Sequence, residues 1–434
     1  MPRRAQLSVS GIRSPERPSE AVATAVPARL VSLDLIRGIA VLGILAINIA
    51  GFAGPRVGTI SPALVAAVTA HRTGLDAFVF GFSLVFFEGK MRALFSLLFG
   101  AGIVLFCERK DASGANSDVL QVRRLFWLMA LGMVHCLLLW WGDILFVYAI
   151  CGLGALTMRG LSERMLLVSA LILYYGWHLW GLLELAPLVH AETAVREGLA
   201  SARQANLVAA WFEPVSTAVD TEMREARLGF LEHFLLKLTH RPLWLLAMTW
   251  GSFSETLPLM LLGMVMYRRG FFSGGISAVR LRMLAMAGIA CGAALSIAFT
   301  SWAVPRGYPP IAMEAALAWG LALPHLVMAL GYAALLVLAT PCLTKTKPGM
   351  WLVAAGRTAF SNYIATSIVM CLCFRAWGLG LFAQFGPALQ WWFVMLGWAM
   401  MLTWSPLWLR HFRRGPLEWL WRSLVEGRPL KNRR

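Results

Sequence analysis

Ten long apolar runs are the feature that most constrains how this chain can fold. They are separated by polar or Pro/Gly-rich breaks and lie at about 31–53, 74–107, 125–141, 143–158, 162–187, 243–267, 281–302, 314–340, 358–377 and 388–409. A helix that spans a bilayer needs about 20 residues, so most of these runs fit one span each. Hydrophobic residues make up 59% of the chain and charged residues only 14%. The chain is therefore predicted to be an all-α, polytopic bundle of transmembrane helices.

The basic residues are distributed unevenly between the two sides of the predicted bundle. If the run at 74–107 crosses once, the loops on the side of the N-terminus hold 26 of the 39 Lys and Arg residues. Cytoplasmic loops of membrane proteins carry such an excess. If that run crossed twice, Arg109, Lys110, Arg123 and Arg124 would move to the outer side, against this rule. We therefore predict ten spans with both termini in the cytoplasm.

The pattern of apolar runs and loops divides the chain into five predicted segments. They are a disordered cytoplasmic tail (1–28), N-terminal transmembrane helices (29–187), an outer amphipathic segment (188–242), C-terminal transmembrane helices (243–412) and a basic cytoplasmic tail (413–434). The outer segment has apolar residues at helical intervals, which predicts one or two amphipathic helices over the bundle. It is interpreted either as a cap over a pocket or as a surface connector.

The net charge of +17 does not indicate a nucleic-acid partner in a chain of this hydrophobicity, because the basic residues are explained by cytoplasmic loops. The expected partner is the lipid bilayer, and the oligomeric state is left open. The seven Cys residues form no CxxC pair and lie mostly within apolar runs. The sequence therefore predicts neither a disulfide framework nor a metal site.

Two charged residues stand at the start of the first apolar run. Asp34 and Arg37 are separated by three positions, which places them on one face of a helix. They are expected to pair at the membrane boundary or to hold a charged ligand there. The alternative is a salt bridge that only fixes the end of the helix.

A second polar pair lies in and after the third apolar run. His135 is part-way along that run, and Asp143 follows eight residues later in the expected outer turn. Both side chains would face one side if the helix continued as far as Asp143. A His inside a membrane span is costly unless it is paired, and it often marks an ion path or a reaction site. The alternative is a structural hydrogen bond between helices.

The second apolar run carries Glu88, Lys90 and Arg92 near its middle. These residues are expected to neutralise one another at a helix break, where they could form a cavity wall. Gly100 and Gly102, further along, supply small residues for close helix packing. No role is assigned to the residues that are isolated in the sequence, which are His178, Glu184, Glu255 and His325.

A set of short motifs then carries a family resemblance. The motifs are SLDxxRGxA at 32–40, FSxLFGxG at 95–102, RR at 123–124, GxxH at 132–135, GDIL at 142–145, GRxAFSNY at 356–363 and GPLEWxxR at 415–422. Together they resemble the YeiB-like family of bacterial inner-membrane proteins, and the match runs from about residue 29 to residue 422. The resemblance implies a multi-pass protein of the bacterial inner membrane.

The first of these motifs is also similar to the first helix of the transmembrane acyltransferase superfamily. That superfamily includes heparan glucosaminide N-acetyltransferases and bacterial polysaccharide O-acyltransferases. The resemblance implies a cytoplasmic acyl-CoA as donor and an acceptor on the other side of the membrane. This chain departs from many polysaccharide O-acyltransferases at Asn48, where they are expected to carry a His late in the first helix.

The leading functional hypothesis is the transfer of an acyl group from acyl-CoA to an envelope glycan or lipid. Arg37 and Arg357 are the candidate residues for binding the anionic donor, with Asp34 orienting Arg37. His135 is the candidate base for the acceptor, and Asp143 is expected to orient the acceptor or to polarise His135. The rival hypothesis is a proton-coupled transporter or flippase, and the third is a structural protein of the envelope.

Overall fold

The computed structural model describes residues 30–240 and 243–434, so the predicted tail at 1–28 lies outside the described residues. Within the described ranges the regular elements are all helices, and there is no β-strand. Eight of the helical segments are long and apolar enough to cross a membrane: α1 (Val31–Ala53), α2 with α3 (Asp76–Phe86 and Lys90–Asp111), α4 (Ser117–Leu138), α6 (Glu163–Arg196), α9 (Trp244–Arg268), α10 (Ala278–Ala303), α12 (Ala322–Leu343) and α15 (Pro387–His411). The prediction of an all-α polytopic bundle is confirmed.

Two shorter apolar helices lie in the fourth and ninth predicted runs. They are α5 (Leu145–Thr157) and α14 (Ala359–Phe374). Five further helices join or cover the apolar ones: α7 (Ala202–Glu225), α8 (Phe230–His240), α11 (Pro310–Ala315), α13 (Lys347–Arg357) and α16 (Pro416–Glu426). A π-helical turn, η4 (Ala316–Gly320), leads into α12.

The second apolar run is one span that is interrupted between α2 and α3. Gly89 has φ +73°, in the left-handed region that favours glycine. The ring of His325 also occupies the position that a Cβ on residue 89 would need. Backbone conformation and close packing therefore both require glycine at this break.

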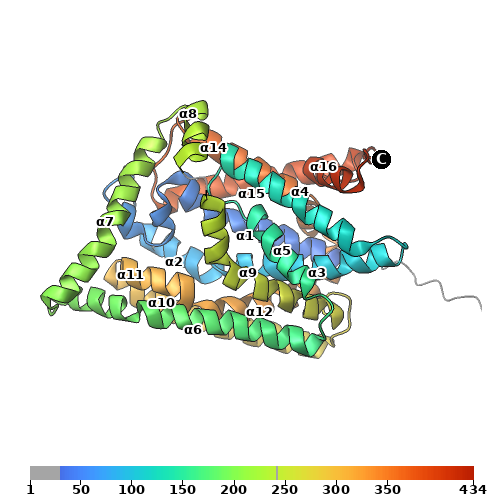
Figure 1. The fold of residues 1–434 in the computed structure, drawn as a ribbon, viewed down its shortest axis with the longest axis horizontal. Helices are drawn as coiled ribbons and strands as arrows, with labels where there is room; N and C mark the ends of the chain where they lie inside the picture. Colours follow the sequence, from blue (N-terminus) through green and yellow to red (C-terminus); the bar gives the residue numbers. More distant parts are fainter. Residues whose placement is uncertain (1–29, 241–242) are drawn as a thin grey trace, which may run out of the picture.

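Contacts between loops show which ends of the helices share one side of the bundle. Ser32 Oγ donates to Phe272 O at 2.8 Å, which joins the start of α1 to the turn after α9. Lys110 Nζ lies 2.6 Å from Glu426 Oε1, which joins the end of α3 to α16. We call this the basic end, and it also holds the C-terminus (Figure 1). These two contacts agree with the predicted alternation, whereas the ten crossings and the cytoplasmic assignment of this end stay predictions.

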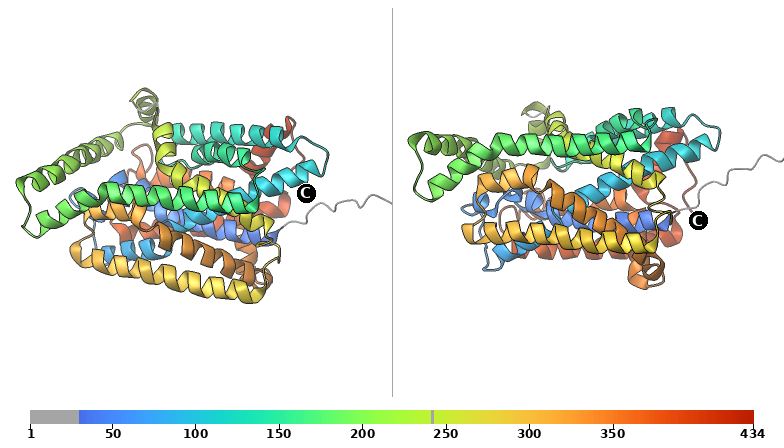
Figure 2. Two further views of the ribbon diagram at one scale, coloured as in Figure 1. Left: turned by 60° about the horizontal axis from the view of Figure 1, so that its bottom comes forward. Right: turned by 90° about the horizontal axis from the view of Figure 1, so that it is seen from below.

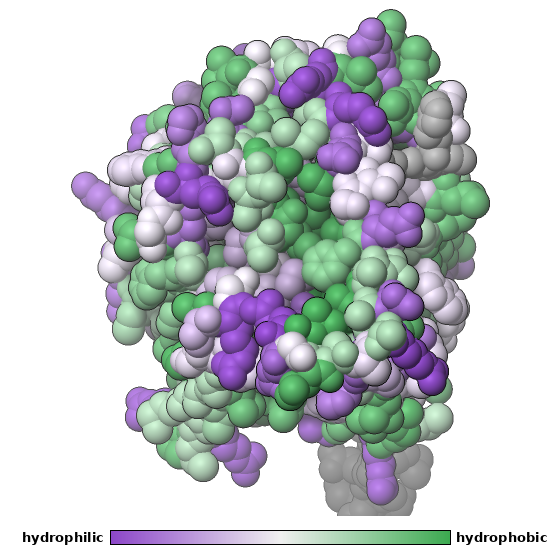
Figure 3. All heavy atoms as spheres, turned by 90° about the vertical axis from the view of Figure 1, so that its left-hand side faces the viewer, coloured by the Kyte–Doolittle hydropathy of each residue, from purple (hydrophilic) through white to green (hydrophobic). Residues whose placement is uncertain are grey.

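The opposite end is covered by helices that leave the bundle. α6 continues past Pro187 to Arg196, so it runs across the predicted boundary between residues 187 and 188. Glu192 on this extension accepts hydrogen bonds from the backbone N–H groups of Ile311 and Ala312 at 3.1 and 2.8 Å. α7 and α8 follow across this end (Figure 2). Figure 3 looks onto this end face, where hydrophobic side chains reach the surface between hydrophilic patches.

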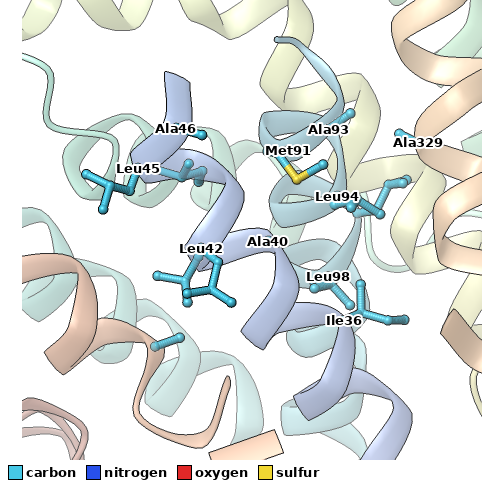
Figure 4. Close-up of a cluster of buried hydrophobic side chains, with 14 of the residues drawn as sticks. Ile36, Ala40, Leu42, Leu45, Ala46, Met91, Ala93, Leu94, Leu98 and Ala329 are labelled. Atoms are coloured by element: carbon cyan, nitrogen blue, oxygen red, sulfur yellow. The ribbon is translucent and has the colours of Figure 1, made fainter. Parts of the chain in front are cut away.

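α1 lies in the interior of the bundle, with most of its side chains buried. Ile36 and Ala40 are fully enclosed and pack close to Met91, Leu94 and Leu98 of α3 (Figure 4). Because lipid tails are as apolar as these side chains, close packing holds such helices together more than the hydrophobic effect does. Gly100 of α3 serves this purpose, since its Cα faces the backbone of Met260 on α9.

The segment predicted as a basic tail folds at its start into α16. Trp421 Nε1 on this helix donates to Arg124 O of α4 at 2.9 Å. Glu418 accepts hydrogen bonds from Phe360 N at 2.8 Å and from Ser361 Oγ at 2.5 Å. The carboxylate therefore caps the N-terminus of α14, where it complements the positive end of the helix dipole. The motifs GRxAFSNY and GPLEWxxR meet at this contact.

Candidate functional site

His135 and Asp143 form a buried pair, which we call the dyad. His135 Nδ1 lies 2.7 Å from Asp143 Oδ2, and the side chains are 1% and 0% exposed. α4 ends at Leu138, so the helix does not continue to Asp143. Instead the turn after α4 brings the carboxylate back to the His. The other oxygen, Asp143 Oδ1, accepts from Phe146 N at 2.8 Å and caps the first turn of α5.

Gly132 makes the return of this turn possible. A Cβ at this position would come too close to Phe146 N and Asp143 Oδ1. The GxxH pattern therefore has a physical explanation, because the glycine lets the turn approach α4 one helical turn before His135.

The geometry of the dyad places Nδ1 of His135 against the Asp143 carboxyl group. An ionised carboxylate only accepts hydrogen bonds, so when Asp143 is ionised the proton between them belongs to Nδ1. Nε2 of His135 is buried and has no hydrogen-bond partner among the described residues. The lone pair on Nε2 is therefore available to take a proton from another molecule.

Tyr363 of α14 completes the surroundings of the dyad. Its ring centroid is 5.0 Å from that of His135. Its hydroxyl group lies 3.4 Å from Gly142 O and 3.4 Å from Ile144 N, on the turn that carries Asp143. Sequence reasoning noted Tyr363 only as part of the GRxAFSNY motif, because nothing in the sequence shows that α14 packs against this turn.

A small, partly open pocket lies beside Tyr363, between α1 and α14. Its polar lining is Asn48, Tyr363, Thr366 and Ser367, and the rest of the lining is apolar. Thr366 Oγ1 is buried and has no hydrogen-bond partner among the described residues. The pocket thus offers polar groups to a ligand next to a titratable pair inside an apolar bundle.

The predicted donor-binding residues are brought to the basic end. Arg37 NH1 lies 3.3 Å from Asp34 Oδ1, which makes the expected pair, and the Arg37 side chain is one-third exposed. α13 crosses α1 so closely that Gly356 packs against Asp34 O. Arg357 follows directly and donates from NH2 to Arg413 O at 3.1 Å. These three residues lie at the other end of α1 from Asn48 and the dyad.

Arg124 adds a stacked guanidinium to this end. It lies over the rings of Phe106 and Trp421, at 4.9 and 4.6 Å from the ring centroids. It is also close enough to Arg37 and Arg422 for their positive charges to repel it. The basic end therefore concentrates positive charge that an anionic ligand would neutralise.

The charges at the broken span are arranged differently from the sequence-based expectation. Arg92 pairs with Glu88 at 2.5 Å, as expected, but also with Glu255 of α9 at 3.5 Å. The interpretation of Glu255 as isolated was wrong, because its partner is 163 residues away in the sequence. Lys90 belongs to this group electrostatically, because Glu88 lies near enough to attract its charge, but its hydrogen bonds go elsewhere: the buried Nζ donates to Leu84 O at 2.9 Å and to Ser296 Oγ at 3.2 Å.

Comparison with known proteins places the chain in a family. A family model described as a protein of unknown function (DUF418) matches residues 266–428. Uncharacterized protein YeiB of Escherichia coli (strain K12) is 31% identical over 92% of this chain and 96% of its own length. The chain belongs to the YeiB-like family. Uncharacterized protein YxaH of Bacillus subtilis (strain 168) is 30% identical to this YeiB-like chain over 91% of the chain and 94% of its own length. No solved structure matches the YeiB-like chain described here.

The family assignment confirms the resemblance seen in the motifs and the membrane character of the chain. The DUF418 match covers α10 to α16 and so includes Arg357, Tyr363 and Glu418. Asp34, Arg37 and the dyad lie before it, and the alignments with YeiB and YxaH cover 92% and 91% of the chain and so include the dyad. The resemblance to the transmembrane acyltransferase superfamily, and the roles of the site residues, stay predictions.

Proposed function

We propose that this YeiB-like protein is a membrane acyltransferase of the bacterial inner membrane. It would take an acyl group from cytoplasmic acyl-CoA and transfer it to a hydroxyl or amine of an envelope glycan or lipid. The observation that carries the proposal is the buried dyad, in which Asp143 holds His135 Nδ1 while Nε2 has no partner among the described residues. An Asp that orients a His in this way is a recurrent arrangement of groups that accept a proton during acyl transfer.

The proton follows a balanced path in this scheme. His135 Nε2 takes the proton from the acceptor O–H or N–H as the acceptor atom attacks the thioester carbonyl carbon. A new C–O or C–N bond forms, and the C–S bond of the thioester breaks. The leaving thiolate then receives the proton from His135 and departs as a thiol. Asp143 stabilises the protonated imidazole between these two steps.

The residues at the basic end fit an anionic donor. Coenzyme A carries phosphate groups, which Arg side chains bind through charge-assisted hydrogen bonds. Arg37 is one-third exposed, and Arg124 lies close to both Arg37 and Arg422. The Asp34 carboxylate offsets part of the Arg37 charge and limits the positions of its guanidinium. Arg357 joins the same end through the crossing of α13 over α1.

The donor residues and the dyad are linked along α1. Arg37 and Asn48 are separated by eleven positions, which corresponds to about 16 Å along a helix with a rise of about 1.5 Å per residue. The pocket lined by Asn48 and Tyr363 is also lined by Val41, so it lies along part of α1 between Arg37 and Asn48. A donor whose phosphate groups bind at the basic end would extend its pantetheine arm along α1, which would bring the thioester carbonyl toward His135.

The proposal is tested by transfer in membrane vesicles. Inside-out vesicles that contain the protein are incubated with radiolabelled acetyl-CoA and longer acyl-CoAs, and label in the glycan and lipid fractions is measured. We expect label that depends on the protein and falls when Arg37 is changed to Ala. Vesicles with folded protein that bind no acyl-CoA and form no labelled product would overturn the proposal.

A second candidate function, proton-coupled transport, is favoured by the charges at the broken span. Arg92 is shared by Glu88 and Glu255, and the buried Lys90 ammonium group donates to Leu84 O and interacts electrostatically with Glu88. Ionisable groups at such a break can carry protons or substrates across a membrane. Proton-dependent uptake of a substrate into vesicles, without an acyl product, would favour this function over acyl transfer.

A further inference from the structure

Residues 410–434 form a basic surface at the basic end, and we call this segment the clasp. It contains eight Lys and Arg residues and two Glu residues, which leaves six positive charges in excess of the side-chain carboxylates. The helix α15 is long and apolar enough to cross a membrane, and it ends at His411. The clasp therefore begins at the boundary of a predicted span, and it includes α16 and the C-terminus (Figure 1).

The clasp is folded, because the chain doubles back after α16 and pairs with the end of α15. Arg413 N donates to Asn432 O at 2.8 Å, and Arg434 N donates to His411 O at 3.0 Å. The Asn432 side chain strengthens this pairing: its Oδ1 accepts from Arg414 N at 3.0 Å, and its Nδ2 donates to Arg414 O at 3.2 Å. A segment that only had to carry the positive charge of a cytoplasmic loop would need no such structure. The hydrogen bonds hold the basic residues at fixed backbone positions.

Two Trp side chains also hold the clasp in place. Trp408 Nε1 donates to Arg414 O at 2.9 Å, and its ring stacks on Phe412 with the centroids 4.1 Å apart. Trp419 Nε1 donates to Leu430 O at 2.6 Å. Trp is enriched where a membrane meets water, because its ring is apolar while its N–H needs a hydrogen-bond acceptor. These contacts fit a clasp that lies at the level of the lipid headgroups.

The two carboxylates of the clasp are engaged with other parts of the chain. Glu418 accepts from Phe360 N and caps the start of α14. Glu426 lies 2.6 Å from Lys110 Nζ, and it is also near enough to Arg123 and Arg428 to attract their charges. One carboxylate thus faces three cations, so it cannot neutralise the remaining basic residues of the clasp.

The basic side chains that remain are available to a ligand. Five of them are exposed and take part in no salt bridge within residues 30–240 and 243–434: Arg410, Arg413, Lys431, Arg433 and Arg434. Because their backbone is already ordered, they lose less conformational freedom on binding than a flexible tail would lose. The anions that a membrane boundary offers to such a surface are the phosphate groups of lipids.

We propose that the clasp binds the headgroups of anionic phospholipids in the leaflet at the basic end. Lys and Arg bind phosphate through charge-assisted hydrogen bonds, and each basic residue close to an anionic membrane surface strengthens the attraction. The five exposed side chains are not among the residues proposed to bind the acyl donor. The proposal therefore does not rest on acyl transfer.

The test is native mass spectrometry of the full chain, purified in a neutral detergent. The probes are phosphatidylglycerol, which is anionic, and phosphatidylcholine, which has no net charge. We expect the apparent dissociation constant to be at least about tenfold lower for phosphatidylglycerol. A clasp variant that combines Arg413→Gln, Lys431→Gln and Arg433→Gln should raise this constant by about tenfold or more, and it should leave the constant for phosphatidylcholine unchanged.

The matched control combines Arg280→Gln, Arg282→Gln and Lys345→Gln. These residues are also exposed, and they lie at the start of α10 and between α12 and α13, outside the clasp. The control lowers the net charge by the same amount, so it should change the constant for phosphatidylglycerol by less than about twofold. Equal weakening in the two variants would show attraction to overall charge and would overturn the proposal. Folded native protein without a preference for phosphatidylglycerol would overturn it as well.

Two additions keep the test decisive. If the clasp variant does not fold, Arg410→Gln combined with Arg434→Gln removes the other two exposed charges and should weaken phosphatidylglycerol binding by several-fold. Acetyl-CoA in excess should leave phosphatidylglycerol bound, because the proposed donor residues lie outside the five. Displacement of the lipid by acetyl-CoA would assign the clasp to the donor and would contradict the proposal.

Discussion

Gly38 of α1 and Gly356 of α13 face each other where the two helices cross. A Cβ on Gly38 would collide with Leu352 O, and a Cβ on Gly356 would collide with Asp34 O. The glycines of the SLDxxRGxA and GRxAFSNY motifs therefore set the distance between Arg37 and Arg357, the two predicted donor-binding arginines.

Changing Gly356 to Ala should separate α1 from α13. Backbone atoms cannot move aside as a flexible side chain can, so we expect a loss of about 1 to 3 kcal/mol of stability. Thermal unfolding in detergent measures this loss. Gly102→Ala is the control, because no atom lies within 4 Å of a Cβ added at that helical position. The control should be neutral or slightly stabilising, and equal losses in both variants would contradict the account.

Changing Asp143 to Asn should impair the dyad while leaving the fold largely intact. The Asn oxygen can still accept from Phe146 N and cap α5, but its amide nitrogen would donate to His135 Nδ1. The proton of the imidazole would then move to Nε2, which removes the lone pair that the proposed base needs. We expect acyl transfer to fall by about 10²- to 10⁴-fold with a small change in melting temperature. Unchanged transfer by this variant would remove Asp143 from the scheme.

The docking of α16 should depend on pH through Glu418. Burial raises the pKa of Glu418, although the hydrogen bonds from Ser361 and Phe360 oppose that shift. Desolvation outweighs the stabilisation that the α14 cap gives to the ionised form, so the docked carboxyl group holds its proton more tightly than in the unfolded chain. Its contribution to stability is fully present below the unfolded pKa of about 4.3 and is lost as pH rises through the higher folded pKa.

Melting temperatures between pH 4 and pH 8 measure this dependence. The native chain should lose stability across the lower part of that range. Glu418→Gln cannot titrate, so its curve should be flatter there. The same slope in both proteins would show that another group is responsible.

Removing Arg92 should leave two carboxylates unpaired inside the bundle. Breaking a buried ion pair by deleting one partner costs about 3 to 5 kcal/mol. We expect Arg92→Met to lower the free energy of unfolding by less than this, by about 1 to 3 kcal/mol, because the Arg92 side chain is 36% exposed and those of Glu88 and Glu255 are 17% and 22% exposed. The triple variant with Glu88→Gln and Glu255→Gln should recover much of this loss. A triple variant as unstable as Arg92→Met would contradict the pairing.

Much of the fold could be predicted from local sequence. Apolar runs of span length correspond to helices because backbone groups in a bilayer must be satisfied within a helix. The break at Gly89 was indicated by three charged residues inside one run. The His135 and Asp143 side chains were chosen from chemistry alone, and the structure brings them together.

The rest depends on contacts between distant parts of the chain. Asp143 would face His135 along a helix only if α4 continued that far, and this condition is not met, because α4 ends at Leu138 and Gly132 lets the turn fold back. The Arg92–Glu255 pair joins α3 to α9, and the Tyr363–His135 contact joins α14 to α4. No local pattern encodes such pairings.

Acyl transfer by a His135→Gln variant tests the central claim most directly. The variant is first shown to bind acyl-CoA as the native chain does, which establishes that the fold and the basic end are intact. Transfer from radiolabelled acetyl-CoA is then measured in vesicles beside the native protein. The account predicts a loss of at least about 10²-fold, because Gln cannot accept the acceptor's proton. Full transfer by the variant would contradict it.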